Sequence, residues 1–178
     1  SGGQVRCPVV FRGPNGAAAR VGAQHSQCYA SWYAHVPGLK VVAPYSAADC
    51  KGLLKAAIRD PNPVVFLENE IMYGQSMEVP DDDDYIVPIG KANVLREGTD
   101  VTITAFSLMV GHALKAADEL KKEGISAEVI DLRSLLPLDL ETIQKSVEKT
   151  GRCVVVHEAT LTSGFGAELA ALVQQHCF

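Results

Sequence analysis

The sequence predicts an α/β fold in which mainly parallel sheets form two successive units. Short apolar runs alternate with helical patterns along most of the chain, and the run Val64–Leu67 is apolar at every position. Between two such alternations lies a stretch, residues 75–90, without apolar periodicity. Alternating strands and helices favour parallel sheets, because a right-handed crossover returns each strand to its sheet in the same direction.

The first unit begins with two short apolar runs, Pro8–Phe11 and Lys40–Ala43, which Gly and Pro residues bound as in buried strands. A helix should begin after Ser46, because an acidic residue follows it three positions on, as in a capping box. Asp60 and the prolines after it should end this helix. Val64–Leu67 then has the continuous pattern of a strand covered on both faces.

The second unit repeats the alternation after residues 75–90, which carry the acidic run Asp81–Asp84 and are predicted to be a linker. The predicted strands are Val101–Phe106, Ala127–Leu132 and Cys153–His157, and the predicted helices are Met109–Glu123 and Leu138–Thr150. A further apolar helical pattern still runs at Phe178, and the chain starts without Met, so we expect a truncated piece of a longer protein.

The composition excludes several classes of partner. Of the 178 residues, 47% are hydrophobic and 21% are charged, which indicates a globular protein, and the net charge of -5 provides no basic surface for nucleic acid. No apolar run reaches the roughly 18 residues that span a bilayer, so we expect no membrane partner. The five cysteines are widely spaced and contain no C-x-x-C, which argues against a disulfide framework or a zinc site.

Polar and aromatic side chains are densest between Phe11 and Tyr33, where a predicted strand ends. Ligands of parallel sheets bind at the carboxyl ends of strands, and His25 has the side-chain type that exchanges protons near neutral pH. The sequence RGPNG, with Gly13 and Gly16, permits a sharp reversal of the backbone. From residue types alone, an ordinary turn followed by a helix in which His25 is hydrogen-bonded is the favoured interpretation, and a ligand site is the alternative.

A long segment, residues 11–74, closely resembles a known family. It reads FRGPNGAAARVGAQHSQCYASWYAHVPGLKVVAPYSAADCKGLLKAAIRDPNPVVFLENEIMYG and is similar to the β subunits of the thiamine-diphosphate-dependent pyruvate dehydrogenase component, in the 2-oxo acid dehydrogenase family. The resemblance implies the C-terminal part of a thiamine-diphosphate-binding (pyrimidine-type) domain at residues 1–74 and a linker at 75–90. It further implies a transketolase C-terminal-like domain, truncated, at 91–178.

The resemblance also implies an activity. Such subunits take part in the oxidative decarboxylation of pyruvate, a 2-oxo acid, and pass the acetyl group to a lipoyl-bearing acyltransferase core. His25 matches the family's catalytic histidine, and Trp32 matches an aromatic residue near the cofactor. The chain lacks the family's cofactor-binding glutamate and any G-D-G-type motif for magnesium and diphosphate. We therefore expect thiamine diphosphate and magnesium to be held mostly by an α subunit in an α2β2 heterotetramer, and this segment alone to be inactive.

A structural potassium site is also implied by the resemblance, at Val9, Ala57, Ile58, Asp60 and Asn62. A physical reason points the same way, because the last carbonyl groups of a helix lack intrahelical partners and carry partial negative charge. Oxygen atoms at such a helix end can bind a hard cation. Without the resemblance, an ordinary helix end that is terminated by proline would be the favoured interpretation.

Two features leave alternatives open. Arg20 stands where pyruvate enzymes usually have glycine, and HEATLTSGFGAEL is closer to the branched-chain 2-oxo acid members, whereas FRGPNG and LENEIMYG favour pyruvate. A single-chain transketolase or deoxyxylulose-phosphate synthase relative, and a docking module without catalysis of its own, are the other hypotheses. The family implies the bacterial cytoplasm or the mitochondrial matrix as the compartment.

Overall fold

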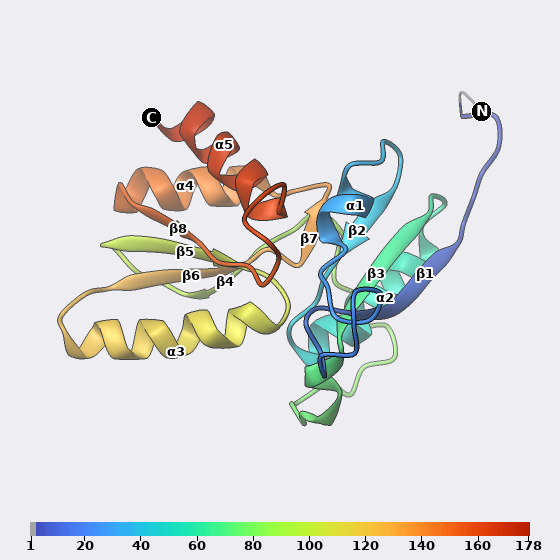
Figure 1. The fold of residues 1–178 in the computed structure, drawn as a ribbon, viewed down its shortest axis with the longest axis horizontal. Helices are drawn as coiled ribbons and strands as arrows, with labels where there is room; N and C mark the ends of the chain where they lie inside the picture. Colours follow the sequence, from blue (N-terminus) through green and yellow to red (C-terminus); the bar gives the residue numbers. More distant parts are fainter. Residues whose placement is uncertain (1–2) are drawn as a thin grey trace.

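A computed structural model describes residues 3–178 and contains two four-stranded sheets, each with its own helices (Figure 1). Residues 1 and 2, which the prediction assigned to the first domain, lie outside the described part. Four of the strand pairings are parallel and two are antiparallel. The predicted α/β fold with mainly parallel sheets is therefore confirmed.

The first sheet contains, in spatial order, β1 (Val10–Asn15), β3 (Val64–Asn69), β2 (Lys40–Val42) and β7 (Ser134–Leu136). Its helices are α1 (Ala30–Ala34), α2 (Ala47–Arg59) and the 3-10 helix η1 (Glu70–Gly74). The cap of α2 is as predicted, because the Ser46 hydroxyl accepts a hydrogen bond from the Asp49 N–H at 3.0 Å and Asp60 is the C-cap. Strand β3 alternates its side chains, so that Val64 and Phe66 face α2 while Val65 and Leu67 face the second unit.

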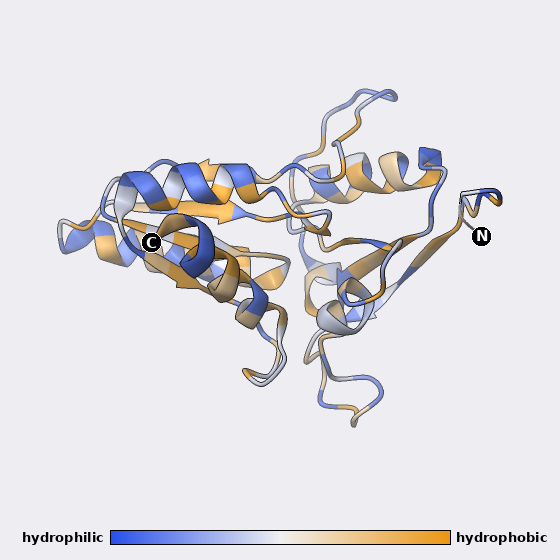
Figure 2. Cartoon of the chain, turned by 90° about the horizontal axis from the view of Figure 1, so that it is seen from above, coloured by the Kyte–Doolittle hydropathy of each residue, from blue (hydrophilic) through white to orange (hydrophobic). Residues whose placement is uncertain are grey.

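The second sheet contains, in spatial order, β4 (Asn93–Arg96), β6 (Ala127–Asp131), β5 (Val101–Ala105) and β8 (Cys153–Val155). Helix α3 (Leu108–Lys122) covers one face, and α4 (Leu140–Thr150) and α5 (Phe165–Cys177) lie over the other (Figure 1). The strands carry mostly hydrophobic residues, whereas the helices alternate hydrophilic and hydrophobic faces (Figure 2). This pattern is typical of a sheet buried between two layers of amphipathic helices. No helix in residues 3–178 has the length and hydrophobicity to cross a membrane.

Three short elements, η1, β4 and β7, were not predicted. Each contains five residues or fewer, too few to establish a periodicity. Strand β7 matters most, because it comes from the second unit in sequence yet pairs antiparallel with β2 of the first sheet. The two units therefore share a sheet.

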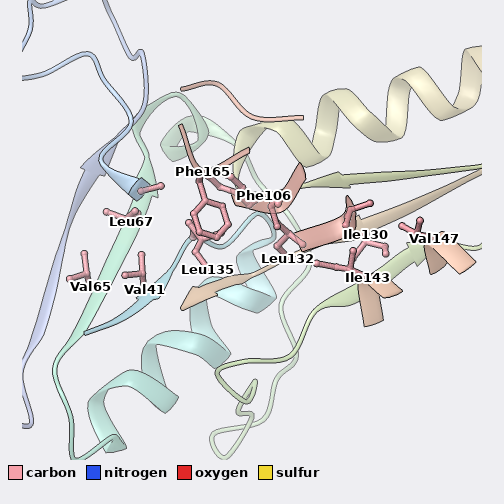
Figure 3. Close-up of a cluster of buried hydrophobic side chains, with 14 residues drawn as sticks. Val41, Val65, Leu67, Phe106, Ile130, Leu132, Leu135, Ile143, Val147 and Phe165 are labelled. Carbon is pink, nitrogen blue, oxygen red and sulfur yellow. The ribbon is translucent and has the colours of Figure 1, made fainter. Parts of the chain in front are cut away.

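One hydrophobic core also extends across both units (Figure 3). Val41 and Val65 come from the first sheet, and they share a cluster with Phe106, Ile130 and Leu135 of the second unit. The rings of Phe106 and Phe165 meet edge to face, with centroids 6.1 Å apart. Because burying this apolar surface stabilises both units together, the junction between them is part of the folded core.

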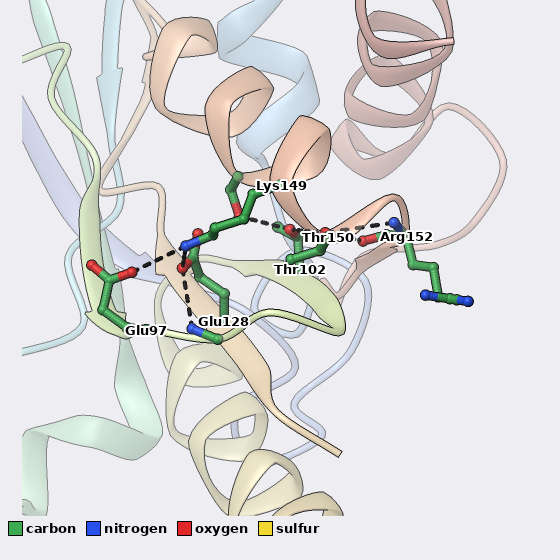
Figure 4. A network of polar contacts seen from close by, with 8 residues as sticks. Glu97, Thr102, Glu128, Lys149, Thr150 and Arg152 are labelled. Atoms are coloured by element: carbon green, nitrogen blue, oxygen red, sulfur yellow. Dashed lines mark hydrogen bonds and ion pairs between the residues drawn. The ribbon is translucent and has the colours of Figure 1, made fainter.

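A buried polar network lies at the other end of the second unit, near the starts of its parallel strands (Figure 4). Glu128 is 2% exposed, forms an ion pair with Lys149 and accepts a hydrogen bond from the Gly98 N–H at 3.2 Å. Burial works to raise the pKa of Glu128, but the hydrogen bonds from Lys149 and its other neighbours lower it overall. The carboxylate is therefore charged and paired, as a buried acid requires.

Candidate functional site

The first sheet places two buried asparagines side by side where its parallel strands end. Asn15 and Asn69 are register partners in β1 and β3 and are 5% and 4% exposed. The Asn15 side-chain carbonyl accepts a hydrogen bond from the Tyr29 N–H at 2.7 Å, and the Asn69 side-chain carbonyl accepts one from the Ile71 N–H at 3.1 Å. Both side chains thus satisfy backbone groups of the chain as it leaves the sheet.

After β1 the chain forms a loop, residues 16–27, which we call the His25 loop. A hydrogen bond of 3.0 Å from the Gly16 N–H to the Gln27 carbonyl closes its neck. Gly16 and Gly22 have φ values of 100° and 91°, and Ala18 and Arg20 also have positive φ, at 45° and 62°. Positive φ at residues other than glycine is uncommon and costs energy, and such strain is typical of functional loops.

Hydrogen bonds within the loop fix its tip. The Ser26 hydroxyl accepts from the Val21 N–H at 2.8 Å, and the Tyr29 hydroxyl donates to the Gln24 carbonyl at 2.6 Å. The His25 N–H donates to the Gly22 carbonyl at 3.3 Å. His25 is therefore held by a turn of the backbone rather than by a helix, and its side chain is exposed.

A cavity of about 1040 Å³ lies between the His25 loop and the second unit, and we call it the interdomain cavity. Its wall includes Ser26, Gln27, Trp32, Leu135, Glu158 and Phe165. Trp32 is 64% exposed, and its ring meets that of Tyr29 edge to face at 5.4 Å. The structure therefore places Trp32 on the cavity wall, whereas His25 lies on the adjacent loop and is not part of that wall.

Glu158, which the sequence reasoning did not single out, connects the second unit to the neck of the His25 loop. One of its carboxylate oxygens accepts a hydrogen bond from the Ala17 N–H at 3.0 Å, and the other accepts one from the Asn69 side-chain amide, also at 3.0 Å. A Cβ at Gly16 would lie 1.9 Å from this carboxylate. The only local signal is position, because Glu158 follows the end of a parallel strand, where ligand-site residues gather.

The residues of the predicted potassium site lie at the end of α2, with Ala57 in its last turn, Asp60 at the C-cap and Asn62 just beyond. The Ala57 carbonyl accepts a hydrogen bond from the Asp60 N–H at 3.2 Å, and the Val9 carbonyl accepts one from the Val64 N–H at 2.9 Å. Each carbonyl oxygen has a second lone pair that can bind a cation. Ile58, the fifth predicted residue, is 64% exposed.

Lys40 already places a cation at the predicted potassium site, because its ammonium lies 2.5 Å from the Asp60 carboxylate. The other carboxylate oxygen of Asp60 accepts hydrogen bonds from the Asn62 N–H and side-chain amide, at 2.9 and 3.0 Å. Burial works to raise the pKa of Asp60, but the hydrogen bonds from Lys40 and Asn62 lower it overall. The Asp60 carboxylate is thus occupied with protein partners, which leaves backbone carbonyls and the side-chain oxygen of Asn62 as the candidate ligands. Residues 3–178 contain no group of three or more His, Cys, Asp or Glu that could hold a metal.

Gly164 is the N-cap of α5, and Gly166 lies in the first turn of that helix. A Cβ at Gly166 would lie 2.3 Å from the ring of His157, and a Cβ at Gly164 would lie 2.7 Å from that ring. Burial lowers the pKa of His157, so the neutral imidazole is favoured. These glycines therefore make room for the histidine.

Comparison with known families places the chain. The description "Transketolase, pyrimidine binding domain" matches residues 1–75, and "Transketolase, C-terminal domain" matches residues 90–178. The chain belongs to the transketolase family. It is 62% identical over 178 residues to the pyruvate dehydrogenase E1 component subunit beta of Rhizobium meliloti (strain 1021), covering 100% of this chain and 39% of that protein. It is 64% identical over 181 residues to the mitochondrial subunit beta-2 of Oryza sativa subsp. japonica, covering 100% of this chain and 48% of that protein.

A solved structure of a transketolase has a similar fold. A split gene transketolase, described as an inactive beta4 tetramer, superposes with a TM-score of 0.80 at 28% identity, covering 96% of this chain and 54% of that one. The resemblance to pyruvate dehydrogenase β subunits is therefore confirmed, and the chain spans about half the length or less of the relatives named here. The predicted domain boundaries stay a prediction. Strand β7 lies in the predicted second domain, at 91–178, yet it pairs in the first sheet.

Proposed function

We propose that the chain is part of a pyruvate dehydrogenase β subunit, which acts with an α subunit in an α2β2 heterotetramer. The reaction is the oxidative decarboxylation of pyruvate with transfer of the acetyl group to lipoyl on an acyltransferase core. The identity of 62% and 64% to subunits of that name, along the whole chain, is the observation that carries the proposal. The exposed His25 on a strained loop beside a large cavity gives it a physical basis.

The interdomain cavity fits part of thiamine diphosphate. The exposed ring of Trp32 and the side chain of Leu135 provide apolar surface for an aromatic ring, and Ser26 adds a hydroxyl group. The wall contains no Lys or Arg among the described residues, so it does not fit the diphosphate or its magnesium ion. When bound, the cofactor supplies the nucleophilic carbon and the electron sink for decarboxylation. We assign the diphosphate and magnesium to the α subunit.

His25 is proposed as the catalytic residue of this chain. Its exposed imidazole can donate a hydrogen bond to a developing oxyanion or move a proton at the substrate carbonyl, and general acid–base catalysis contributes about 10²–10⁴-fold. The test uses the full-length β chain with its α partner, thiamine diphosphate and magnesium, and measures carbon dioxide release. His25→Ala should lose about 10²-fold or more in kcat. His112→Ala, at an exposed position of α3, is the matched control and should retain normal turnover.

Two outcomes would end this assignment. Near-normal turnover of His25→Ala would remove the catalytic role from His25. Failure of the wild-type pair to release carbon dioxide from any 2-oxo acid would refute the proposed activity as a whole. Size-exclusion chromatography should show that the His25→Ala variant still forms the heterotetramer, because the side chain is exposed on a loop.

Pyruvate is favoured over branched-chain 2-oxo acids. The two segments that favour it, FRGPNG and LENEIMYG, pack together: Arg12 forms an ion pair of 2.6 Å with Glu68, and the Tyr73 hydroxyl donates to Glu68 at 2.8 Å. Burial and the Glu68 carboxylate raise the pKa of Tyr73 to about 12, so its hydroxyl stays protonated and donates. The ratio of kcat/KM for pyruvate to that for a branched-chain 2-oxo acid tests the choice. A ratio below one would reverse it.

A potassium ion at the end of α2 is proposed as a structural ligand, held by backbone carbonyls around Ala57, Ile58 and Val9. Thermal unfolding of the heterotetramer should then occur at a higher temperature in potassium chloride than in sodium chloride at equal ionic strength. Equal midpoints in the two salts would remove the ion from the proposal. The result for Asp60→Asn would show whether the Lys40 ion pair competes with the ion.

The compartment and the core partner follow from the same proposal. The Oryza sativa relative is named mitochondrial and the Rhizobium meliloti relative is bacterial, which supports the mitochondrial matrix or the bacterial cytoplasm. A docking role without catalysis is the alternative for this segment. It predicts that His25→Ala leaves turnover unchanged, whereas the main proposal predicts lost turnover with retained binding to the lipoyl-bearing core.

A further inference from the structure

We propose that Glu158 is a positioning residue that holds the His25 loop from the opposite unit, an inference that rests on the proposed function. Glu158 lies just after β8 in the second unit, and the loop lies after β1 in the first. Glu158 and Ala17 are joined by a hydrogen bond although they are 141 residues apart in the sequence. The second unit would thus control the geometry of the loop that carries the catalytic histidine.

The contact is built from two hydrogen bonds with defined polarity. Each oxygen of the Glu158 carboxylate accepts one, from the Ala17 N–H and from the Asn69 side-chain amide, and both measure 3.0 Å. Rotating the Asn69 side-chain amide by half a turn would break a second hydrogen bond, because its carbonyl oxygen accepts from the Ile71 N–H. A group with two acceptors and no donor is therefore required at position 158, and a carboxylate is such a group.

The backbone at the neck is shaped around this carboxylate. Gly16 has φ 100°, and a Cβ there would lie 1.9 Å from Glu158 and 2.7 Å from the Asn69 amide nitrogen. The space is thus taken by the Glu158 side chain, and the N–H of the next residue, Ala17, points at it. Charge-assisted hydrogen bonds of this kind are roughly twice as strong as neutral ones.

The loop depends on this anchor because its own conformation is strained. Ala18 and Arg20 hold positive φ immediately after the anchored Ala17. The other hydrogen bonds described above for the loop run within it or to Tyr29, so they fix its shape but not its position against the second unit. Releasing Ala17 would let residues 17–27 move as a body and would displace His25 from the substrate.

The test exchanges the polarity of the Glu158–Asn69 pair in the full-length β chain, assembled with its α subunit. Glu158→Gln places a donor against the Asn69 amide donor or against the Ala17 N–H, and Asn69→Asp places two carboxylates together. The double variant restores one donor and one acceptor, and the carboxylate introduced at position 69 can still accept from the Ile71 N–H. Hydrogen exchange by mass spectrometry follows residues 17–27, and steady-state kinetics give kcat and KM for pyruvate. Glu148→Gln, at an exposed position of α4, is the matched control.

Glu158→Gln should raise amide exchange in residues 17–27 about fivefold or more, leave exchange in α3 unchanged, and lower kcat about tenfold with little change in KM. Asn69→Asp should be worse, because like charges repel, and the double variant should return both measurements to within about threefold of wild type. Glu148→Gln should match wild type. If a single variant fails to assemble, the double variant decides.

Unchanged exchange in residues 17–27 of Glu158→Gln would overturn the proposal, and so would a double variant that is no better than the singles. Amide exchange is measured without substrate, so it tests the hydrogen bonds of Glu158 even if the wild-type pair releases no carbon dioxide. A wild-type pair that releases no carbon dioxide would refute the proposed function and leave the proposal for Glu158 to the exchange data.

Discussion

The two units differ in the segment that connects the first parallel strand of each to the rest of the chain. After β5 the chain enters the 15-residue helix α3, which buries Val110, Ala113 and Ala117 against the sheet. After β1 it enters the His25 loop and the five-residue helix α1, in which Ala30 is the buried residue. Packing of an apolar stripe therefore defines the first connection, whereas hydrogen bonds to distant residues hold the second.

This difference separates a scaffold from a site. Apolar burial is non-directional and stabilises α3 wherever its stripe meets the sheet. A hydrogen bond contributes only about 0.5–1.5 kcal/mol net, but it fixes direction and distance. The His25 loop has the second kind of support, through Glu158, Asn15 and Tyr29. Substitutions should therefore separate the two regions cleanly.

The largest effect is expected from Gly16→Ala. Its φ of 100° strains any side chain, and the added Cβ would lie 1.9 Å from the Glu158 carboxylate. The free energy of unfolding should fall by about 2–4 kcal/mol, and kcat should fall about 100-fold because the neck of the loop must move. Urea denaturation and steady-state kinetics of the assembled enzyme measure the two quantities.

Two other glycines provide matched controls. A Cβ at Gly22, with φ 91°, and one at Gly13 would each meet nothing within 4 Å. Gly22→Ala should cost about 1–2 kcal/mol through strain alone, and Gly13→Ala should cost about 0.5 kcal/mol or less. Equal losses for Gly16→Ala and Gly22→Ala would show that contact with Glu158 adds nothing.

A pH effect should distinguish the buried junction between the units from the exposed loop. Asp131 is fully buried at the end of β6, and burial, with a further contribution from the Asp49 carboxylate, raises its pKa to about 7. The Arg133 N–H and guanidinium oppose this shift, and the same guanidinium lies 2.6 Å from Asp49. A raised folded-state pKa means that stability is highest below the unfolded value of 3.8 and is lost as pH rises to about 7.

Asp131→Asn should remove this pH dependence. Between pH 5 and pH 7 the wild type should lose about 2 kcal/mol of unfolding free energy relative to the variant, since each pKa unit corresponds to about 1.4 kcal/mol. Denaturation curves of both proteins at each pH provide the comparison. Parallel pH profiles would mean that Asp131 is ionised throughout.

Val110→Ala tests the other side of the comparison. Removing two carbons from a side chain that is 0% exposed should cost about 2 kcal/mol, from lost burial and the cavity left behind. Because α3 packs on the second sheet, amide exchange in residues 17–27 should stay unchanged until the whole protein unfolds. Faster exchange in the loop would show that the two regions are coupled through the core.

The same difference explains which elements could be predicted from the sequence. Helix α2 was predicted to within a residue, because Ser46, its apolar stripe and Asp60 are all local signals. Strand β7 was missed, since its three residues acquire their structure only by pairing with β2, more than 90 residues earlier. The role of Glu158 was missed for the same reason, because no pattern near position 158 indicates that Ala17 and Asn69 are its partners.

Apart from the Gly13→Ala control, the smallest predicted effect comes from Tyr29→Phe, which tests the shape of the loop and not its position. The change removes the hydroxyl that donates to the Gln24 carbonyl at 2.6 Å but keeps the ring that meets Trp32 edge to face. We expect a loss of about 0.5–1.5 kcal/mol, and amide exchange about two- to tenfold faster near His25. Exchange at Ala17 should stay as in wild type, because Glu158 still accepts from its N–H. Faster exchange at Ala17 as well would mean that the loop opens as one unit, so that its internal bonds and its anchor to the second unit cannot be separated.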